Sequence, residues 1–151
     1  MNFDPSPIFE SVKRIKDTIP SDVILLAAAK TRSLEEVEAV IQAGVTHIGH
    51  NYVQEAMPII QIIGSKAKWH MIGHLQRNKA KLVIENFNMI ETIDSCRLAQ
   101  TLNRFCEEAQ KSMPVMIEIN SGKEANKTGI LPEALDNLIE KMVTLEHLHI
   151  Q

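Results

Sequence analysis

The chain has 151 residues, of which 44% are hydrophobic and 23% charged, and its formal net charge is -3. This composition is typical of one globular domain, and the negative charge gives no electrostatic reason to expect a nucleic acid partner. No apolar run is long enough to span a membrane, and the N-terminal residues lack the charged-then-apolar order of a signal peptide. We therefore expect a single domain over residues 1–151, located in the cytoplasm.

The two cysteines support this localisation. Cys96 and Cys106 fall in one predicted helix, where ten residues of separation place them roughly 15 Å apart along the axis. That distance is too long for a disulfide. Reduced cysteines are expected in the cytoplasm.

The first elements of the chain are a leading helix, a strand and a second helix. The helix is predicted over residues 5–18, and the continuous apolar run at 23–30 predicts a strand buried on both faces. Ser33 then starts the second helix, with Glu36 three residues later and Gly44 at the end. This is the pattern of a capping box closed by a C-terminal glycine.

The alternation of strands and helices continues to the last residue. Further strands are predicted at 45–49, 67–73, 87–94, 113–120 and 148–150, and helices at 53–63, 78–86, 95–111 and 132–145. Pro58 is expected to kink or break the helix in which it lies. Six strands separated by helices predict a parallel sheet, and right-handed crossovers leave a doubly wound sheet or a barrel.

Polar residues recur where the predicted strands end. They are Lys30, His50, Asn51, His74, Gln76, Asp94, Ser95, Asn120 and Ser121, with His70 inside the third strand and Lys127 shortly after the fifth. In barrels of parallel strands the chemistry is located at these carboxyl ends. Loops after strands are usually polar as well, so the pattern by itself also fits an ordinary surface.

Lys30 is the sharpest single feature. It ends an apolar run, so its amine faces either solvent or a cavity. A lysine amine that loses its proton in a cavity is a nucleophile toward aldehydes. A lysine that simply extends into solvent from the end of a strand is the alternative structural explanation.

The sequence gives no sign of a metal centre or of the common nucleotide-binding motifs. His70 and His74 are four residues apart, but the strand pattern around His70 separates their side chains. Arg77, Lys79 and Lys81 form the densest basic cluster, which is typical of a solvated helix face. No glycine-rich nucleotide fingerprint, phosphate-binding loop or hydrolase elbow is present.

Five ordered blocks resemble the pyridoxal-phosphate homeostasis family. The blocks are Ala-Ala-Ala-Lys-Thr at 27–31, Gly-His-Asn-Tyr-Val-Gln-Glu-Ala at 49–56, Trp-His-Met-Ile-Gly-His-Leu-Gln at 69–76, Ile-Asp-Ser at 93–95, and Glu-Ile-Asn-Ser-Gly followed by Lys-Thr-Gly within 118–129. Together they cover nearly the whole chain. The resemblance implies the barrel domain of fold-type III enzymes such as alanine racemase, a PLP-binding (β/α)8 barrel of the TIM type, of which this chain supplies roughly six strands.

The resemblance also implies a cofactor and its site. The cofactor is pyridoxal 5'-phosphate (PLP), held as a Schiff base on Lys30, with Asn51, His70, Ser95 and Asn120 lining the site. Lys127 corresponds to a family block without a defined role.

The sequence departs from the family pattern in two places. His50 stands where the family usually has glutamate, which changes the local charge. The chain also stops in the sixth strand, whereas family members continue through two more strands that carry the phosphate loop. We therefore expect a fragment, or a barrel completed by a partner chain.

The resemblance implies a carrier that controls PLP and amino and keto acid pools, as a monomer or homodimer, rather than an efficient enzyme. A weak PLP-dependent amino-acid racemase is the first alternative. A βα scaffold that binds no cofactor and acts only through protein contacts is the second.

Overall fold

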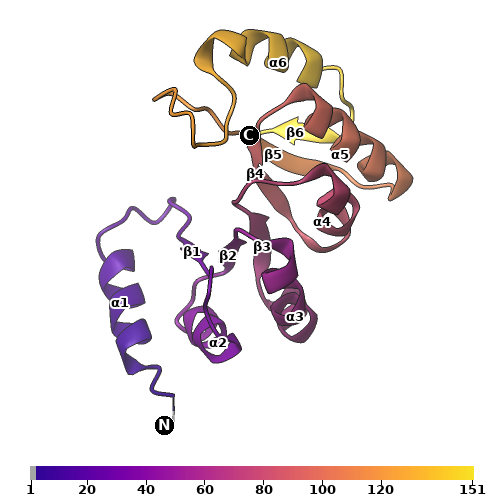
Figure 1. The fold of residues 1–151 in the computed structure, drawn as a ribbon. Helices are drawn as coiled ribbons and strands as arrows, with labels where there is room; N and C mark the ends of the chain where they lie inside the picture. The colour runs from indigo at the N-terminus through magenta and orange to yellow at the C-terminus, as the bar shows by residue number, and fades with distance from the viewer. Residues whose placement is uncertain (1–2) are drawn as a thin grey trace. The chain divides into compact units, whose positions relative to one another are not determined.

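A computed structural model describes residues 3–151. Six parallel strands follow one another in the order of the chain, β1-β2-β3-β4-β5-β6, with helices in the connections (Figure 1). The predicted parallel α/β class is therefore confirmed. The chain separates into two compact units, Met1–Trp69 and His70–Gln151, which are described in turn. The expectation of a single domain stays a prediction.

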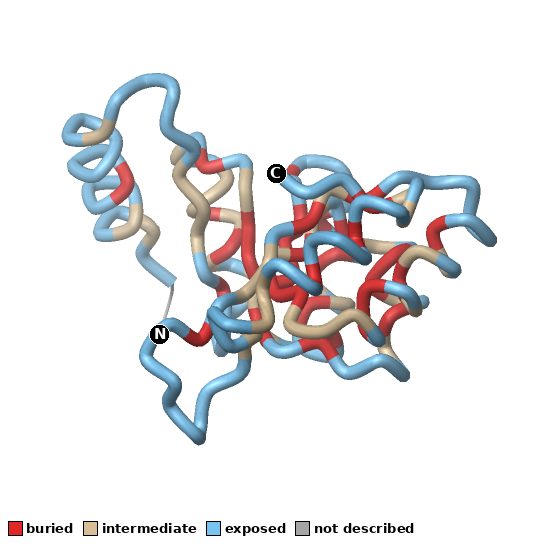
Figure 2. The backbone as a smooth tube through the Cα atoms, turned by 90° about the horizontal axis from the view of Figure 1, so that it is seen from above, coloured by how far each residue is buried: buried red, intermediate tan, exposed pale blue. Residues whose placement is uncertain are grey.

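The first unit contains two parallel strands and three helices before the start of β3. Its elements are α1 (Ser6–Lys16), β1 (Leu26–Ala28), α2 (Leu34–Gln42), β2 (His47–His50), α3 (Val53–Ile63) and η1 (Gly64–Lys66). Helix α1 packs against α2, but Val12 is its one buried residue in the described structure. Most of α1 is accordingly exposed (Figure 2).

The sequence signals around α2 are confirmed. The Ser33 hydroxyl accepts a hydrogen bond from the Glu36 amide, and the Glu36 carboxylate accepts one from the Ser33 amide. Gly44 follows the helix with φ of 89°, a backbone conformation that glycine adopts without strain. Local chemistry therefore fixes both ends of α2.

One prediction in this unit is wrong in detail. The strand expected at 23–30 is reduced to three residues, and Val23 and Ile24 are 50% and 67% exposed rather than buried. The Val23 amide donates to the Pro20 carbonyl in a turn, and β1 has a single neighbour at the edge of the described sheet. Pro58 does not break its helix, because α3 continues through it, and the alternative of a kink stays a prediction.

The second unit contains the remaining strands. Strand β3 (Lys68–Met71) crosses the boundary between the units and is followed by η2 (Arg77–Lys79), α4 (Ala80–Asn86), β4 (Met89–Ile93), α5 (Cys96–Glu108), β5 (Met113–Ile117), η3 (Pro132–Ala134), α6 (Leu135–Met142) and β6 (Leu148–Ile150). Helix α5 packs against both α4 and α6.

The strand register in this unit separates a core face from a polar face. Met71, Ile90 and Val115 lie side by side on neighbouring strands and are fully buried. Residues alternate between faces along a strand, so His70 and Glu91 share the opposite face. Buried segments are concentrated in the strands and on one side of the helices (Figure 2). The face that carries His70 is therefore the one available for chemistry.

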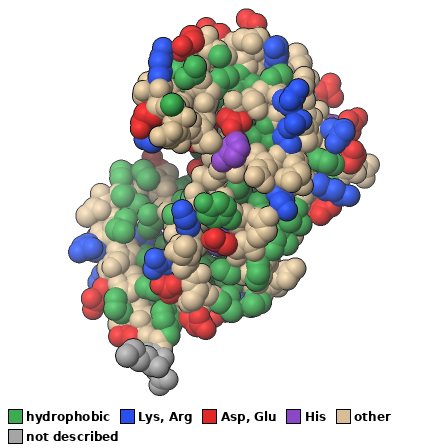
Figure 3. Space-filling view, in the orientation of Figure 1, with side chains coloured by type: hydrophobic (Ala, Val, Ile, Leu, Met, Phe, Trp, Pro, Cys, Tyr) green, Lys and Arg blue, Asp and Glu red, His purple; other side chains and the backbone are tan. Residues whose placement is uncertain are grey.

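Hydrophobic side chains also reach the surface of both units, among charged ones (Figure 3). No helix within residues 3–151 combines the length and the apolar character that crossing a membrane requires.

Cys96 and Cys106 lie in α5 as predicted and are unpaired with each other. Burial raises the pKa of the Cys106 thiol to about 11, so this thiol stays protonated at neutral pH.

Candidate functional site

Lys30 emerges from the carboxyl end of β1. The preceding Ala29 is buried, and its amide continues the pairing with β2 by donating to the Gly49 carbonyl at 2.8 Å. The chain then turns at Lys30 and Thr31, and the Arg32 amide donates back to the Ala29 carbonyl. The apolar strand thus ends at a tight turn that leaves the Lys30 side chain exposed.

Thr31 holds this turn in a strained conformation. Its φ is 61°, a left-handed value that β-branched residues rarely adopt. Its hydroxyl donates to the Lys30 carbonyl at 2.6 Å. Strained residues of this kind concentrate at functional sites. The sequence showed nothing unusual at Thr31, because backbone angles are not visible in residue types.

Asn51 and Tyr52 lie next to Lys30 in the first unit. Ala28 pairs with Gly49 in the parallel register, and continuing that register places Lys30 level with Asn51. The Lys30 Nζ atom is 5.4 Å from the centroid of the Tyr52 ring, close enough for a cation–π interaction. Tyr52 is the single tyrosine of the chain and is 50% exposed. The amine is therefore held beside an aromatic face at the strand ends.

His50, which precedes Asn51 and Tyr52 in the sequence, is buried. Its side chain is 1% exposed, and its ring centroid is 6.0 Å from that of Trp69. Neither ring nitrogen has a hydrogen-bond partner within residues 3–151. Burial lowers the pKa of His50, and the carboxylate of Glu55 opposes this effect. The imidazole is thus neutral at neutral pH and packs as part of the core.

His70 occupies the polar face of the second unit. It is buried, and its Nδ1 atom lies 2.6 Å from the Oε1 atom of Glu91 on β4. The acid fixes the orientation of the imidazole. Glu91 was not among the predicted site residues, although it alternates with the apolar residues of β4 and so faces the same side as His70.

Ser95 and Asn120 each have a structural role in the second unit. The Ser95 hydroxyl accepts a hydrogen bond from the Leu98 amide at the start of α5. The Asn120 side-chain amide donates to the Glu124 and Lys127 carbonyls, and its oxygen accepts from the Glu124 amide. Asn120 therefore organises the loop after β5, and the Lys127 ammonium pairs with Glu124 at 2.6 Å.

The far end of that loop returns to β5. The Ile130 amide donates to the Glu118 carbonyl, and the Thr128 hydroxyl donates to the Glu118 carboxylate. Gly129, with φ of 103°, passes so close that an added Cβ would lie 2.8 Å from the Asn120 amide nitrogen. The Lys-Thr-Gly block thus has a backbone role that its sequence did not reveal.

The five residues predicted to line the cofactor site are divided between the units. Lys30 and Asn51 lie in the first; in the second, His70 lies within β3, and Ser95 and Asn120 follow β4 and β5. Their function as one site stays a prediction. Within residues 3–151, no group of three or more histidine, cysteine, aspartate or glutamate side chains could hold a metal ion.

Parallel βα units with polar side chains at the carboxyl ends of the strands define an α/β protein whose chemistry would be located at that edge of the sheet. Residues 4–151 match the family described as alanine racemase, N-terminal domain. The chain belongs to that family.

Similar proteins carry a more specific name. The chain is 40% identical over 131 residues to the "Pyridoxal phosphate homeostasis protein" of Pasteurella multocida, covering 85% of this chain and 56% of the relative. It is 33% identical over 150 residues to the protein of the same name from Synechocystis, covering 98% of this chain and 67% of the relative. The chain spans about half the length of the first of these relatives.

Solved structures with a similar fold include PipY and an alanine racemase. PipY of Synechococcus elongatus, solved without PLP, matches with a TM-score of 0.90 and 29% identity, covering 95% of this chain and 68% of PipY. The PLP-bound PipY structure matches with a TM-score of 0.86, 28% identity and the same coverage. Alanine racemase of Clostridium difficile shares the fold, with a TM-score of 0.81, 17% identity, and coverage of 100% of this chain and 42% of the racemase.

Proposed function

We propose that this chain binds PLP through Lys30 and takes part in the homeostasis of PLP and of amino and keto acid pools. One observation carries the proposal: an exposed lysine leaves β1 at a strained turn, level with Asn51 and beside the Tyr52 ring. Relatives that are 33% to 40% identical are named for PLP homeostasis, and PipY has been solved with PLP bound.

The residues present fit the aldehyde end of the cofactor. PLP supplies an aldehyde and an electron-withdrawing ring. Lys30 would hold the cofactor covalently by condensing its amine with the aldehyde, which releases one water. The turn at Thr31 positions the amine, and Tyr52 offers an aromatic face beside it. The family resemblance assigns the rest of the lining to His70, which Glu91 orients, and to Ser95 and Asn120, and this assignment stays a prediction.

The proposal assigns a carrier role in the cytoplasm, as a monomer or homodimer. Racemisation needs acid/base groups on both faces of the substrate. Tyr52 is the single tyrosine available, and its ring, rather than its hydroxyl, is the part described beside Lys30. Retention of the cofactor is therefore favoured over turnover.

The test is imine formation by the 151-residue chain. Adding PLP is expected to produce a visible imine absorbance, and reduction with borohydride should attach the cofactor to the peptide that contains Lys30. Lys30→Ala should abolish both signals. Lys68→Ala is the matched control. Lys68 is exposed and lies at the amino end of β3, whereas Lys30 follows the carboxyl end of β1. Absence of the imine in the unaltered chain, or attachment to another lysine, would overturn the proposal. Formation of D-alanine from L-alanine would favour the racemase.

A further inference from the structure

An open pocket of about 490 Å³ lies at the carboxyl ends of β3 and β4 in the second unit. Ligand pockets typically have volumes of roughly 300–1,000 Å³. Its lining comes from three segments of this unit: the loop after β3, the start of α5, and the end of the loop after β5. All of these residues belong to one unit, so the pocket is complete without any residue of the first.

Two arginines contribute cationic side chains to its lining. Arg77 and Arg97 are both exposed, and neither forms an ion pair within residues 3–151. His74 contributes an imidazole whose Nδ1 atom is 3.1 Å from the Asp94 Oδ2 atom. Two guanidinium groups without a carboxylate partner are suited to an anion with two or more oxygens, because their planar forks bind such groups in pairs.

Hydroxyl and backbone groups add to this preference. Ser95 and Thr128 both line the pocket, and the pocket reaches the first turn of α5, a helix of 13 residues. The N-terminus of a helix favours negative charge. The Ser95 oxygen already caps Leu98, so the arginines provide the main attraction.

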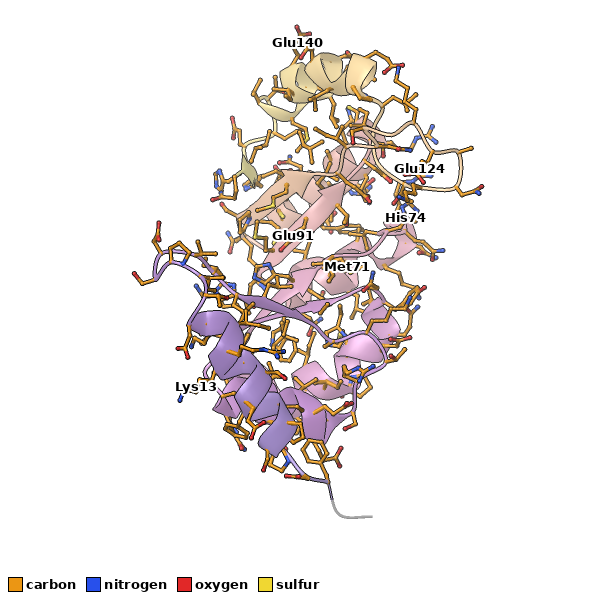
Figure 4. The ribbon with its side chains drawn as sticks, turned by 90° about the vertical axis from the view of Figure 1, so that its left-hand side faces the viewer. Lys13, Met71, His74, Glu91, Glu124 and Glu140 are labelled. Atoms are coloured by element: carbon orange, nitrogen blue, oxygen red, sulfur yellow. The ribbon has the colours of Figure 1, made fainter. Side chains whose placement is uncertain are left out.

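Two carboxylates in the neighbourhood oppose an anion. Asp94 lines the pocket but is paired with His74. Glu124 lies on the same side of the unit as His74 (Figure 4) and is paired with Lys127 at 2.6 Å. The Glu124 carboxylate is therefore balanced by an ammonium and Asp94 contacts an imidazole, whereas Arg77 and Arg97 have no carboxylate partner within residues 3–151.

We propose that this pocket, formed by His74, Arg77, Ser95, Arg97 and Thr128, is an oxyanion-binding site for a small carboxylate or phosphate. It does not depend on the Schiff base proposed for Lys30. The free carboxylate of an amino or keto acid and a phosphate group share the chemistry that the arginines recognise, and separate probes distinguish them.

The probes are inorganic phosphate and succinate, neither of which carries an aldehyde. Binding to the 151-residue chain is followed by titration calorimetry and by the Nε–Hε signals of the arginine side chains in NMR spectra, with sodium chloride at matched ionic strength as the reference. Saturable binding of either probe, with shifts of the Arg77 and Arg97 signals, is expected. The probe that binds more tightly identifies the preferred oxyanion.

Four variants make the test specific. Arg77→Gln and Arg97→Gln should each weaken binding about tenfold, the usual effect of losing one charge-assisted contact. Arg104→Gln is the matched control on the same helix, because Arg104 lies outside the pocket and pairs with Glu108. Asp94→Asn should tighten binding several-fold, since it removes the one carboxylate of the lining. If Asp94 only held His74 in place, its replacement would not tighten anion binding.

The result that overturns the proposal is equally specific. No saturable binding beyond the chloride reference, or binding that is equal in the Arg77→Gln, Arg97→Gln and Arg104→Gln variants, excludes an oxyanion site here. Because the probes form no imine, this result leaves the PLP proposal for Lys30 untouched.

Discussion

The buried imidazole of His70 is paired with the carboxylate of Glu91, with 2.6 Å between Nδ1 and Oε1. The contact links β3 to β4 on the polar face of the second unit. A partly buried hydrogen-bonding contact of this kind contributes more than an exposed one, because solvent competes with it less and its loss leaves a polar atom without that partner.

Glu91→Ala is therefore expected to lower the free energy of unfolding by roughly 1–3 kcal/mol. Urea denaturation measures the change. Glu108→Ala is the control, because Glu108 pairs with Arg104 at 3.7 Å on the exposed side of α5, and a loss below about 0.5 kcal/mol is expected there. Equal losses in the two variants would contradict a special role for the His70–Glu91 contact.

Much of the fold could be predicted from the sequence because local signals agreed with the tertiary structure. Helix α3 was predicted with its observed limits, and the capping box of α2 is formed by the predicted residues. The run at 23–30 was misjudged because apolar composition does not reveal how many neighbours a strand has. Val23 and Ile24 stand before the paired residues of β1, and their exposure is a tertiary property.

The candidate site could be predicted in part, because the predicted parallel topology brings the ends of neighbouring strands together. Lys30 and Asn51 end adjacent strands, so parallel topology alone brings them level. Glu91 was missed because it lies within β4, a strand that was treated as apolar. The strain at Thr31 and the close approach of Gly129 are backbone properties, which side-chain patterns do not show.

His50 should make stability depend on pH. Burial lowers its pKa in the folded protein below the ordinary value of 6.5, and Glu55 opposes this only in part. Below about pH 6.5 the unfolded chain binds a proton that the folded chain does not, so stability falls as the pH falls. The effect of one such group is at most about 1.4 kcal/mol per pH unit.

The measurement compares the unaltered chain with His50→Leu in urea denaturation from about pH 7.5 to about pH 5.5. The variant removes two buried nitrogens that have no partner within residues 3–151, so it should be at least as stable near neutral pH. Its stability should also decrease less on acidification. The same decrease in both proteins would rule His50 out as the group responsible.

Gly129 should tolerate no side chain. An added Cβ would lie 2.8 Å from the Asn120 amide nitrogen and 3.1 Å from the Glu118 carbonyl oxygen, and φ is 103°. Gly129→Ala is therefore expected to cost roughly 1–3 kcal/mol of stability. Gly122→Ala is the matched control in the same loop, because its nearest contact is the flexible Glu124 side chain. Thermal unfolding of the two variants is compared, and a similar effect in both would contradict the tight packing of Gly129.

Replacing Thr31 by a residue that adopts a positive φ without strain should stabilise the chain. A β-branched residue at φ of 61° is strained, and the left-handed conformation costs most residues roughly 1–2 kcal/mol, whereas asparagine tolerates it. Thr31→Asn is therefore expected to raise the free energy of unfolding by about 0.5–1 kcal/mol. Thr31→Val keeps the strain but removes the hydroxyl that donates to the Lys30 carbonyl, so it should lose about 0.5–1.5 kcal/mol. Urea denaturation ranks the three proteins. Both variants lack the hydroxyl, so if Thr31→Asn proved less stable than the unaltered chain, loss of the hydroxyl contact would outweigh the relief of strain in the turn that presents Lys30.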